Sequence, residues 1–327
     1  MKKLVFLLVI AMIITMAASC SKTEKKQTIK IGINVWPGYA HAFIAQEKGI
    51  FEKNGVTVEL MLRKDISDST ELYRHGEADG VFTLVPDVVI FNSEGISTKI
   101  VHVTDYSDTG DVIIGKGQYN SLAELKGKTI SFEGFNTFSH MFVLRSLEKA
   151  GVGEGKIRLA NIPAHEVLTA LEDGQIDAGH TWEPVKSQAL AKGYKILAKA
   201  GDIPGIITDV LAFNSKIVEE RPGDIRAIIK SLLEARDFVH TNREQALEIM
   251  SKAEGMNTEE MNSGINGVYQ PDLKENIEAM KKSENAKSLH SSGKKIAEFF
   301  LQRGQISKIP DMSEIIEAKF VNELAVK

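Results

Sequence analysis

The chain has 327 residues, of which 43% are hydrophobic and 26% charged, and its formal net charge is −4 at pH 7. This length suits one large or two medium α/β domains, and the composition excludes a chain that is disordered or membrane-embedded throughout. Lysine and arginine are dispersed rather than arranged in a stripe, so no nucleic-acid partner is indicated.

The N-terminal segment has the pattern of a secretion signal. Two lysines precede a short apolar stretch and three small residues, which lead to Cys20, the only cysteine of the chain. The apolar stretch is too short for a spanning helix. The segment resembles a bacterial lipobox, which implies removal of residues 1–19, a lipid on Cys20 that anchors the protein to a membrane, and a polar tether over 20–28. Ordinary secretion with a free thiol is the alternative.

Strands and helices alternate in the first part of the remaining chain. The stretch 29–33 is predicted as a strand that runs into the turn at Trp36-Pro37-Gly38. A helix over 39–48 should stop at Gly49, because glycine readily adopts the conformation that ends a helix. The next expected elements are strands at 56–62, 78–85, 99–104 and 111–114, with helices at 67–75 and from Pro86 onward.

The alternation resumes after a glycine-containing break at 115–117. The expected helices are 121–125, 135–150 and 164–173, the expected strands are 129–132, 156–160, 176–179 and 206–213, and a further helix and strand fall within 186–197. Such alternation predicts mostly parallel sheets with helices on both faces.

The C-terminal third is predicted to be helical. Pro222 suits the first turn of a helix with one apolar stripe. Asn242 and Gln245 have the spacing of a capping box for a helix over 245–252. Further helices are expected at about 258–268, 286–303 and 312–326.

Both tryptophans of the chain lie in proline-containing turns at predicted strand ends. Trp36 is followed by Pro37 and Tyr39, and Trp182 is followed by Glu183. Ligands of open α/β sheets gather at strand ends. We therefore expect the two indoles to face one ligand across a gap between two lobes. Core packing is the alternative for each tryptophan taken singly.

Polar residues near these turns are further candidates for ligand contacts. Asn136, Thr137 and Ser139 open a helix, where free backbone N–H groups and hydroxyls suit an anion or a polar oxygen; an ordinary N-cap is the alternative. Glu183 beside Trp182 would suit a cationic amine, or it is a solvated turn carboxylate. Asp209 is expected near the same rim, as are Asp105 and Tyr106, each with a surface-loop alternative.

No motif for catalysis, metal binding or phosphate binding is present in the sequence. The eight histidines lack the spacing of metal ligands, and the lone cysteine stands at the expected lipidation position. We therefore predict a binding protein with no catalytic residue, no metal and no cofactor.

Several motifs together resemble the substrate-binding proteins of ABC importers for nitrate, sulfonates and taurine, a family that includes binders of thiamine precursors. The motifs are Ile31-Gly32-Ile33-Asn34-Val35-Trp36-Pro37-Gly38-Tyr39, the segment 45–56, the segment 122–130, Gly134-Phe135-Asn136-Thr137-Phe138-Ser139-His140, and the segment 174–178 with Trp182-Glu183-Pro184. Phe135 and Phe138 depart from the small residues that relatives commonly carry, which argues against a compact sulfonate cradle.

The resemblance implies a periplasmic-binding-protein fold of type II with two lobes that close on a ligand. Lobe 1 would comprise 29–112 and 208–327, lobe 2 would comprise 113–207, and the hinge would lie near Ile113 and Val210. The matching positions that would contact the ligand are Trp36, Pro37, Tyr39, Thr83, Asn136, Thr137, Ser139, Trp182 and Glu183.

The implied function is extracytoplasmic capture of a small polar ligand by a monomer, followed by delivery to the ABC permease subunits. A sensory receptor of the same fold that docks on a signalling protein is the alternative. A lyase-like or synthase-like relative of the fold is a third hypothesis.

Overall fold

The computed structural model describes residues 27–326 except residue 136. The predicted signal peptide 1–19, the lipidation of Cys20 and the ligand contact of Asn136 therefore lie outside the described residues. Within the described ranges, no helix is both long and apolar enough to cross a membrane.

The larger sheet has the strand order β11-β4-β10-β3-β1-β2. β1 pairs in parallel with β2 and β3, whereas β10 runs antiparallel to both β3 and β4. The central strand β3 is buried along its whole length, as its apolar sequence requires. The strands of this sheet are β1 (Ile29–Asn34), β2 (Val58–Arg63), β3 (Gly80–Leu84), β4 (Thr98–Ser107), β10 (Thr208–Asn214) and β11 (Val268–Tyr269).

The smaller sheet has the strand order β7-β6-β8-β5-β9. β6 pairs in parallel with β7 and β8, and β5 runs antiparallel to β8 and β9. Its strands are β5 (Val112–Gly115), β6 (Thr129–Phe132), β7 (Arg158–Asn161), β8 (Ala178–Thr181) and β9 (Lys195–Lys199).

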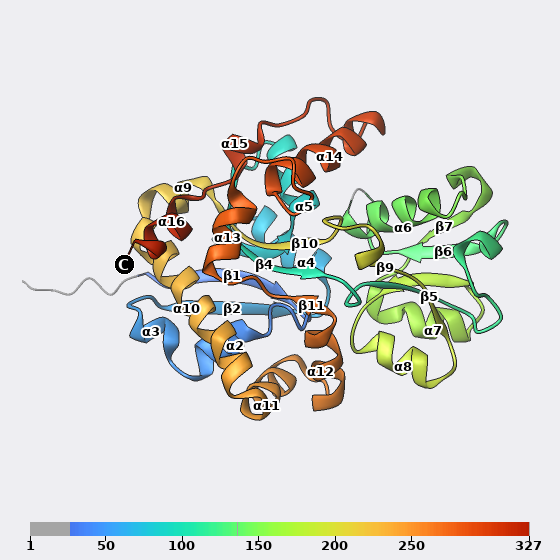
Figure 1. Cartoon of the computed structure of the whole chain (residues 1–327), viewed down its shortest axis with the longest axis horizontal. Helices are drawn as coiled ribbons and strands as arrows, with labels where there is room; N and C mark the ends of the chain where they lie inside the picture. Colours follow the sequence, from blue (N-terminus) through green and yellow to red (C-terminus); the bar gives the residue numbers. More distant parts are fainter. Residues whose placement is uncertain (1–26, 136, 327) are drawn as a thin grey trace, which may run out of the picture.

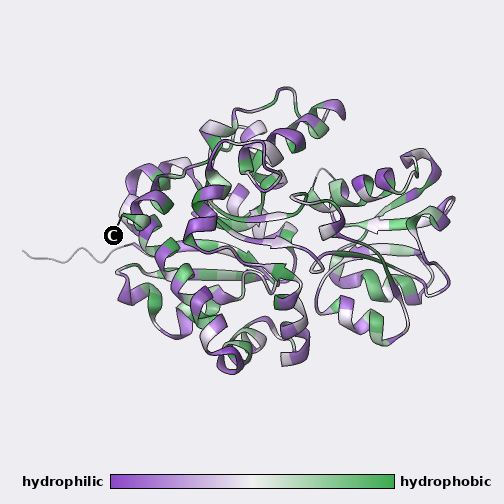
Figure 2. Ribbon diagram, viewed as in Figure 1, coloured by the Kyte–Doolittle hydropathy of each residue, from purple (hydrophilic) through white to green (hydrophobic). Residues whose placement is uncertain are grey.

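Helices cover each sheet, and apolar and polar residues alternate along the outer ones (Figure 2). The helices and 3₁₀ turns between β5 and β10 are η1 (Leu122–Leu125), α6 (Phe138–Lys149), η2 (Glu154–Lys156), η3 (Ala164–Glu166), α7 (Val167–Glu172), α8 (Val185–Ala191) and η4 (Ala200–Asp202). The helices of the rest of the chain are α2 (His41–Glu47), α3 (Ile50–Lys53), α4 (Ile66–Arg74), α5 (Val85–Ser93), α9 (Ser215–Glu220), α10 (Pro222–Thr241), α11 (Arg243–Glu254), α12 (Thr258–Asn266), α13 (Leu273–Met280), α14 (Leu289–Gln302), α15 (Met312–Ile315) and α16 (Lys319–Ala325).

The two sheets belong to two lobes that lie side by side (Figure 1). The chain leaves the larger lobe between β4 and β5 and returns between β9 and β10. The antiparallel pairs arise at these crossings, because the strands that carry the chain out and back run against their neighbours. The predicted two-lobed α/β fold is confirmed, and the lobe boundaries at 112/113 and 207/208 stay a prediction.

The helical C-terminal part differs from the sequence prediction at several points, and helix α13 and strand β11 were not predicted at all. The capping box at Asn242 is wrong: its side chain caps no backbone N–H, and its Nδ2 instead donates to the Thr241 hydroxyl at 2.8 Å. Capping boxes occur at Asn257 and at Asp272. The helix expected at 312–326 is broken, because Ile316 is extended and forms a parallel bridge with Ile100 of β4.

Candidate functional site

The two tryptophan-bearing turns meet at the junction of the lobes. Trp36 follows β1 of the larger sheet and Trp182 follows β8 of the smaller sheet. Their rings stand edge to face with 6.2 Å between centroids, and the Trp182 Nε1 donates to the Val35 carbonyl at 3.2 Å. Each side chain is less than a tenth exposed, at 5% and 7%. The indoles thus touch each other across the junction in a closed arrangement.

A small cavity remains beside this contact, with a volume of about 10 Å³. That volume is about what one water molecule requires, so a ligand of several atoms can enter only when the lobes separate. Residues of both lobes and of the crossing segment line the cavity: Asn34, Trp36, Tyr39, Ile66, Leu84, Asp111, Phe138, Trp182 and Asp209.

Two buried carboxyl groups face each other next to the cavity, because Asp105 of β4 stands opposite Asp209 of β10. The Trp36 Nε1 donates to Asp105 at 3.2 Å, and the Tyr39 hydroxyl donates to Asp209. Burial raises the pKa of Asp105 to about 8. Burial, with the nearby charges of Asp105 and Asp111, also raises the pKa of Asp209 well above its usual value.

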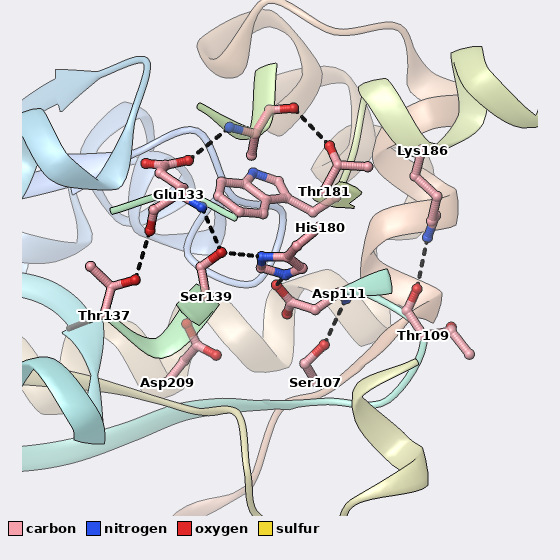
Figure 3. A network of polar contacts seen from close by, with 12 residues as sticks. Ser107, Thr109, Asp111, Glu133, Thr137, Ser139, His180, Thr181, Lys186 and Asp209 are labelled. Carbon is pink, nitrogen blue, oxygen red and sulfur yellow. Dashed lines mark hydrogen bonds and ion pairs between the residues drawn. The ribbon is translucent and has the colours of Figure 1, made fainter. Parts of the chain in front are cut away.

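Asp111 is held in place by a buried polar network (Figure 3). Its Oδ1 lies 3.0 Å from the Nε2 of His180, and the Nδ1 of His180 lies 2.7 Å from the Ser139 hydroxyl. The Asp111 backbone N–H donates to the Ser107 hydroxyl at 2.9 Å. These contacts fix the orientation of the Asp111 carboxylate.

The two described hydroxyls at the start of α6 are occupied by contacts within the protein. Thr137 is an ordinary N-cap that accepts a bond from the His140 backbone at 3.4 Å, while its hydroxyl donates to the Glu133 carbonyl at 2.6 Å. Ser139 is fully buried and accepts a bond from the Glu133 N–H at 2.8 Å. Neither side chain lines the cavity.

Glu183, which the sequence suggested for contact with a cationic amine, is instead bonded to other residues of the protein. Its carboxylate is 2% exposed, pairs with Lys186 at 2.9 Å and accepts a hydrogen bond from Ser263 of α12 at 2.7 Å. Ser187 donates two further bonds to it. Glu183 therefore ties the Trp182 turn to the larger lobe without lining the cavity.

Pro37 and Thr83 also lie beside the cavity rather than in its lining. Pro37 packs so closely on Gly264 of α12 that a Cβ there would lie 2.3 Å from the Pro37 Cγ. The Thr83 hydroxyl donates to Asp87 at 2.9 Å. Pro37 follows Trp36 in the chain and Thr83 precedes Leu84, so each is adjacent to a residue that lines the cavity.

The sequence prediction singled out Trp36, Tyr39, Trp182 and Asp209, which the structure brings together at the cavity. It assigned no ligand contact to Asn34, Asp111 or Phe138, which line the same cavity. A usable signal was present for Asn34, a polar residue at the end of an otherwise apolar strand. Among the described residues, no group of histidine, cysteine and acidic side chains could hold a metal ion.

Comparisons with known proteins agree with this architecture. The family described as "NMT1/THI5 like" matches residues 36–246. A putative binding protein of Brucella abortus is 29% identical over 214 residues, which cover 64% of this chain and 66% of that protein, just under two thirds of its length.

Two solved structures show the shared fold. The periplasmic aliphatic sulphonate binding protein from Escherichia coli superposes with a TM-score of 0.75 at 18% identity, over 90% of this chain and 92% of that one. The desulfurization enzyme DSZB superposes with a TM-score of 0.68 at 13% identity, over 92% and 99%.

Proposed function

Since this chain belongs to the NMT1/THI5-like family, we propose that it is the substrate-binding protein of an ABC importer. It captures a small polar ligand of the nitrate, sulfonate, taurine or pyrimidine type between its lobes and delivers it to the permease subunits. It acts outside the cytoplasm as a lipid-anchored monomer, held to the membrane through Cys20 after residues 1–19 are removed, and it needs no cofactor.

The cavity at the lobe junction is the observation that carries this proposal. Two lobes that supply opposite walls of one cavity can hold a ligand only when they are closed on it. A ligand shifts the balance toward closure by its differential affinity for the closed state. Trp36, Tyr39, Trp182 and Asp209 contact the ligand, and the crossings between 29–112, 113–207 and 208–327 act as the hinge.

A buried Ser139–His180–Asp111 chain invites comparison with a hydrolytic triad, since one structural neighbour is an enzyme. A nucleophilic serine must reach its substrate, however, and Ser139 is buried away from the cavity lining. The network supports a positioning role for Asp111 and a protein that binds without catalysis.

The function is tested by small-angle scattering and thermal unfolding of residues 20–327 with nitrate, methanesulfonate, taurine and 4-aminopyrimidine. At least one compound is expected to reduce the radius of gyration and raise Tm without being converted. Turnover of a bound compound would instead establish an enzyme, and no effect of any compound on either quantity would contradict the proposal. A permease gene next to this gene would favour import, and a sensor-kinase gene would favour sensing.

A further inference from the structure

We propose that the cleft is built for a small planar ligand that carries N–H donors or a positive charge, and that the spare oxygens of Asn34 and Asp111 accept its hydrogen bonds. This inference rests on the proposed function and names the chemical class that the site takes. It sets the chain apart from sulfonate and nitrate binders, whose ligands are anions.

The first support is a set of buried acceptors that the described chain leaves unused. The side-chain oxygen of Asn34 and one carboxylate oxygen of Asp111 accept no hydrogen bond from the described residues. Both residues are 2% exposed and line the cavity. A buried oxygen without a donor costs stability, so two of them in the lining of one cavity indicate that a ligand supplies the donors.

The second support is that the donors of the lining are already engaged. The Asn34 Nδ2 and the Trp182 Nε1 both donate to the Val35 carbonyl, each at 3.2 Å. The Trp36 Nε1 donates to Asp105 at 3.2 Å, and the Tyr39 hydroxyl donates to Asp209. Among the described lining residues none is lysine, arginine or histidine. Neither the two indole N–H groups nor the Tyr39 hydroxyl is therefore free to donate to an anion in this lining.

The third support comes from the rings around these acceptors. Trp36, Tyr39, Phe138 and Trp182 supply aromatic walls from both lobes. Aromatic faces attract cations and stack on flat rings. A planar ring that enters when the lobes part can replace the edge-to-face contact of the two indoles, with its N–H groups directed to the acceptors.

The discriminating experiment compares two sets of probes on the folded protein. Isothermal titration calorimetry and thermal unfolding are measured with 4-aminopyrimidine and benzamidine, and with the anions nitrate and methanesulfonate. We expect saturable binding and a raised Tm in the first set only. Binding of the anions alone would overturn this inference and leave the proposed function intact, whereas no binding of any probe would count against both.

Near-isosteric variants test the assigned acceptors. Asp111→Asn replaces a carboxylate oxygen by an amide, and Asn34→Leu removes the amide oxygen from a side chain of similar shape, so affinity for the bound probe should fall by about tenfold or more in each. Asp224→Asn is the matched control, because Asp224 is a buried carboxyl of α10 that pairs with Arg221 and lines no part of the cavity. Unchanged probe affinity in both cavity variants, or tighter binding of methanesulfonate in either, would refute the assignment. Circular dichroism of each variant establishes that it is folded.

Discussion

Trp36 and Trp182 are the two tryptophans of the sequence, and they contact each other although they are 146 positions apart in the chain. Each indole closes one wall of the cavity, and each donates its Nε1 hydrogen to an acceptor in the larger lobe. The closed arrangement therefore depends on both rings, which makes each a sensitive probe of the proposed ligand capture.

Trp182→Ala should abolish most ligand-induced closure while leaving a cooperative unfolding transition. The substitution removes the ring that contacts Trp36 and Phe138, and it costs about 3–5 kcal/mol of unfolding free energy as a buried large-to-small change. Tyr119→Ala is the control, because Tyr119 is equally buried in the smaller lobe but lines no part of the cavity. The control should lose stability and keep its affinity in titration calorimetry; equal affinity in both variants would remove Trp182 from the site.

The stability of the ligand-free protein should fall as pH rises from about 6.5 to 8. Burial raises the pKa of Asp105 to about 8 and that of Glu254 to about 8, so the folded state binds more protons than the unfolded state in this window. Below about 6.5 the buried His41 and His102 act in the opposite sense, because burial lowers their pKa values to about 4 and about 3.

Calorimetric Tm values between pH 6.5 and 8 measure this slope, and Asp105→Asn should flatten it. The Asn side chain can still accept the Trp36 Nε1 hydrogen bond, so the variant isolates the ionisation from the contact. A Tm that rises across the window in the wild-type chain would contradict the assignment of a protonated carboxyl at this position.

Sequence reasoning singled out the aromatic residues of the cavity lining more readily than its acids. Tryptophans in strand-end turns stand out at once, whereas the role of a carboxylate depends on its partners. Glu183 adjoins Trp182 and looked available, yet Lys186 lies one helical turn further on and pairs with it. Asp111 gained its role from His180, 69 positions away, a contact that no local pattern carries.

Among the helices, α12 contacts both of the turns that carry the tryptophans. Its Gly264 lies against Pro37 of one turn and near the Glu183 side chain of the other, and its Ser263 bonds to Glu183. This helix therefore contacts both walls of the closed cleft without lining the cavity.

Gly264→Val should weaken ligand binding by obstructing closure. A Cβ at this position would lie 3.3 Å from the Glu183 Cγ of the smaller lobe, so the valine methyl groups obstruct closure. The same Cβ would lie 2.3 Å from the Pro37 Cγ within the larger lobe, and such overpacking costs about 1–3 kcal/mol of stability. Gly223→Ala in α10 is the control, since its added Cβ would meet open space. Scattering should show a larger radius of gyration for Gly264→Val at saturating ligand; a normal closed radius would show that α12 yields to the added side chain.

The alternating elements were predictable, and the deviations arose from long-range contacts. The strand at 129–132 was predicted with the bounds that β6 has, because apolar residues and flanking glycines mark it. The tail was predicted as one helix over 312–326, but the Glu317 N–H donates to the Ile100 carbonyl and draws the chain to the sheet edge. Helical periodicity carries no information about such a neighbour.

At the scale of the whole molecule, polar contacts between the lobes hold the closed arrangement. Arg303 at the end of α14 makes two bonds to Glu154 of η2, at 2.8 and 3.0 Å. Two further contacts join the lobes: the Ser67 hydroxyl donates to Glu133 at 3.2 Å, and His165 pairs with Asp65 at 2.5 Å. These pairs can exist only while the lobes are together, so they contribute to the closed state and are absent from the open one.

Arg303→Met should therefore shift the equilibrium toward the open form and leave ligand selectivity unchanged. The pair is partly exposed, with side-chain exposures of 29% and 44%, so its contribution to closure is about 0–1 kcal/mol. Affinity for every ligand should fall by the same factor, up to about fivefold, because the ligand must now supply that part of the closure free energy. Salt at 0.5 M should reproduce the loss in the wild-type chain and have less effect on the variant.

Arg226→Met is the matched control, because Arg226 pairs with Glu323 within the larger lobe and that pair is present whether the cleft is open or closed. Its loss should lower Tm slightly without changing affinity. If both variants weaken binding equally, the effect is one of general stability, and the lobes close through their apolar and aromatic surfaces alone. If only Arg303→Met does so, charge pairs far from the cavity set how readily the cleft closes, while the acceptors around the cavity decide which ligand it closes upon.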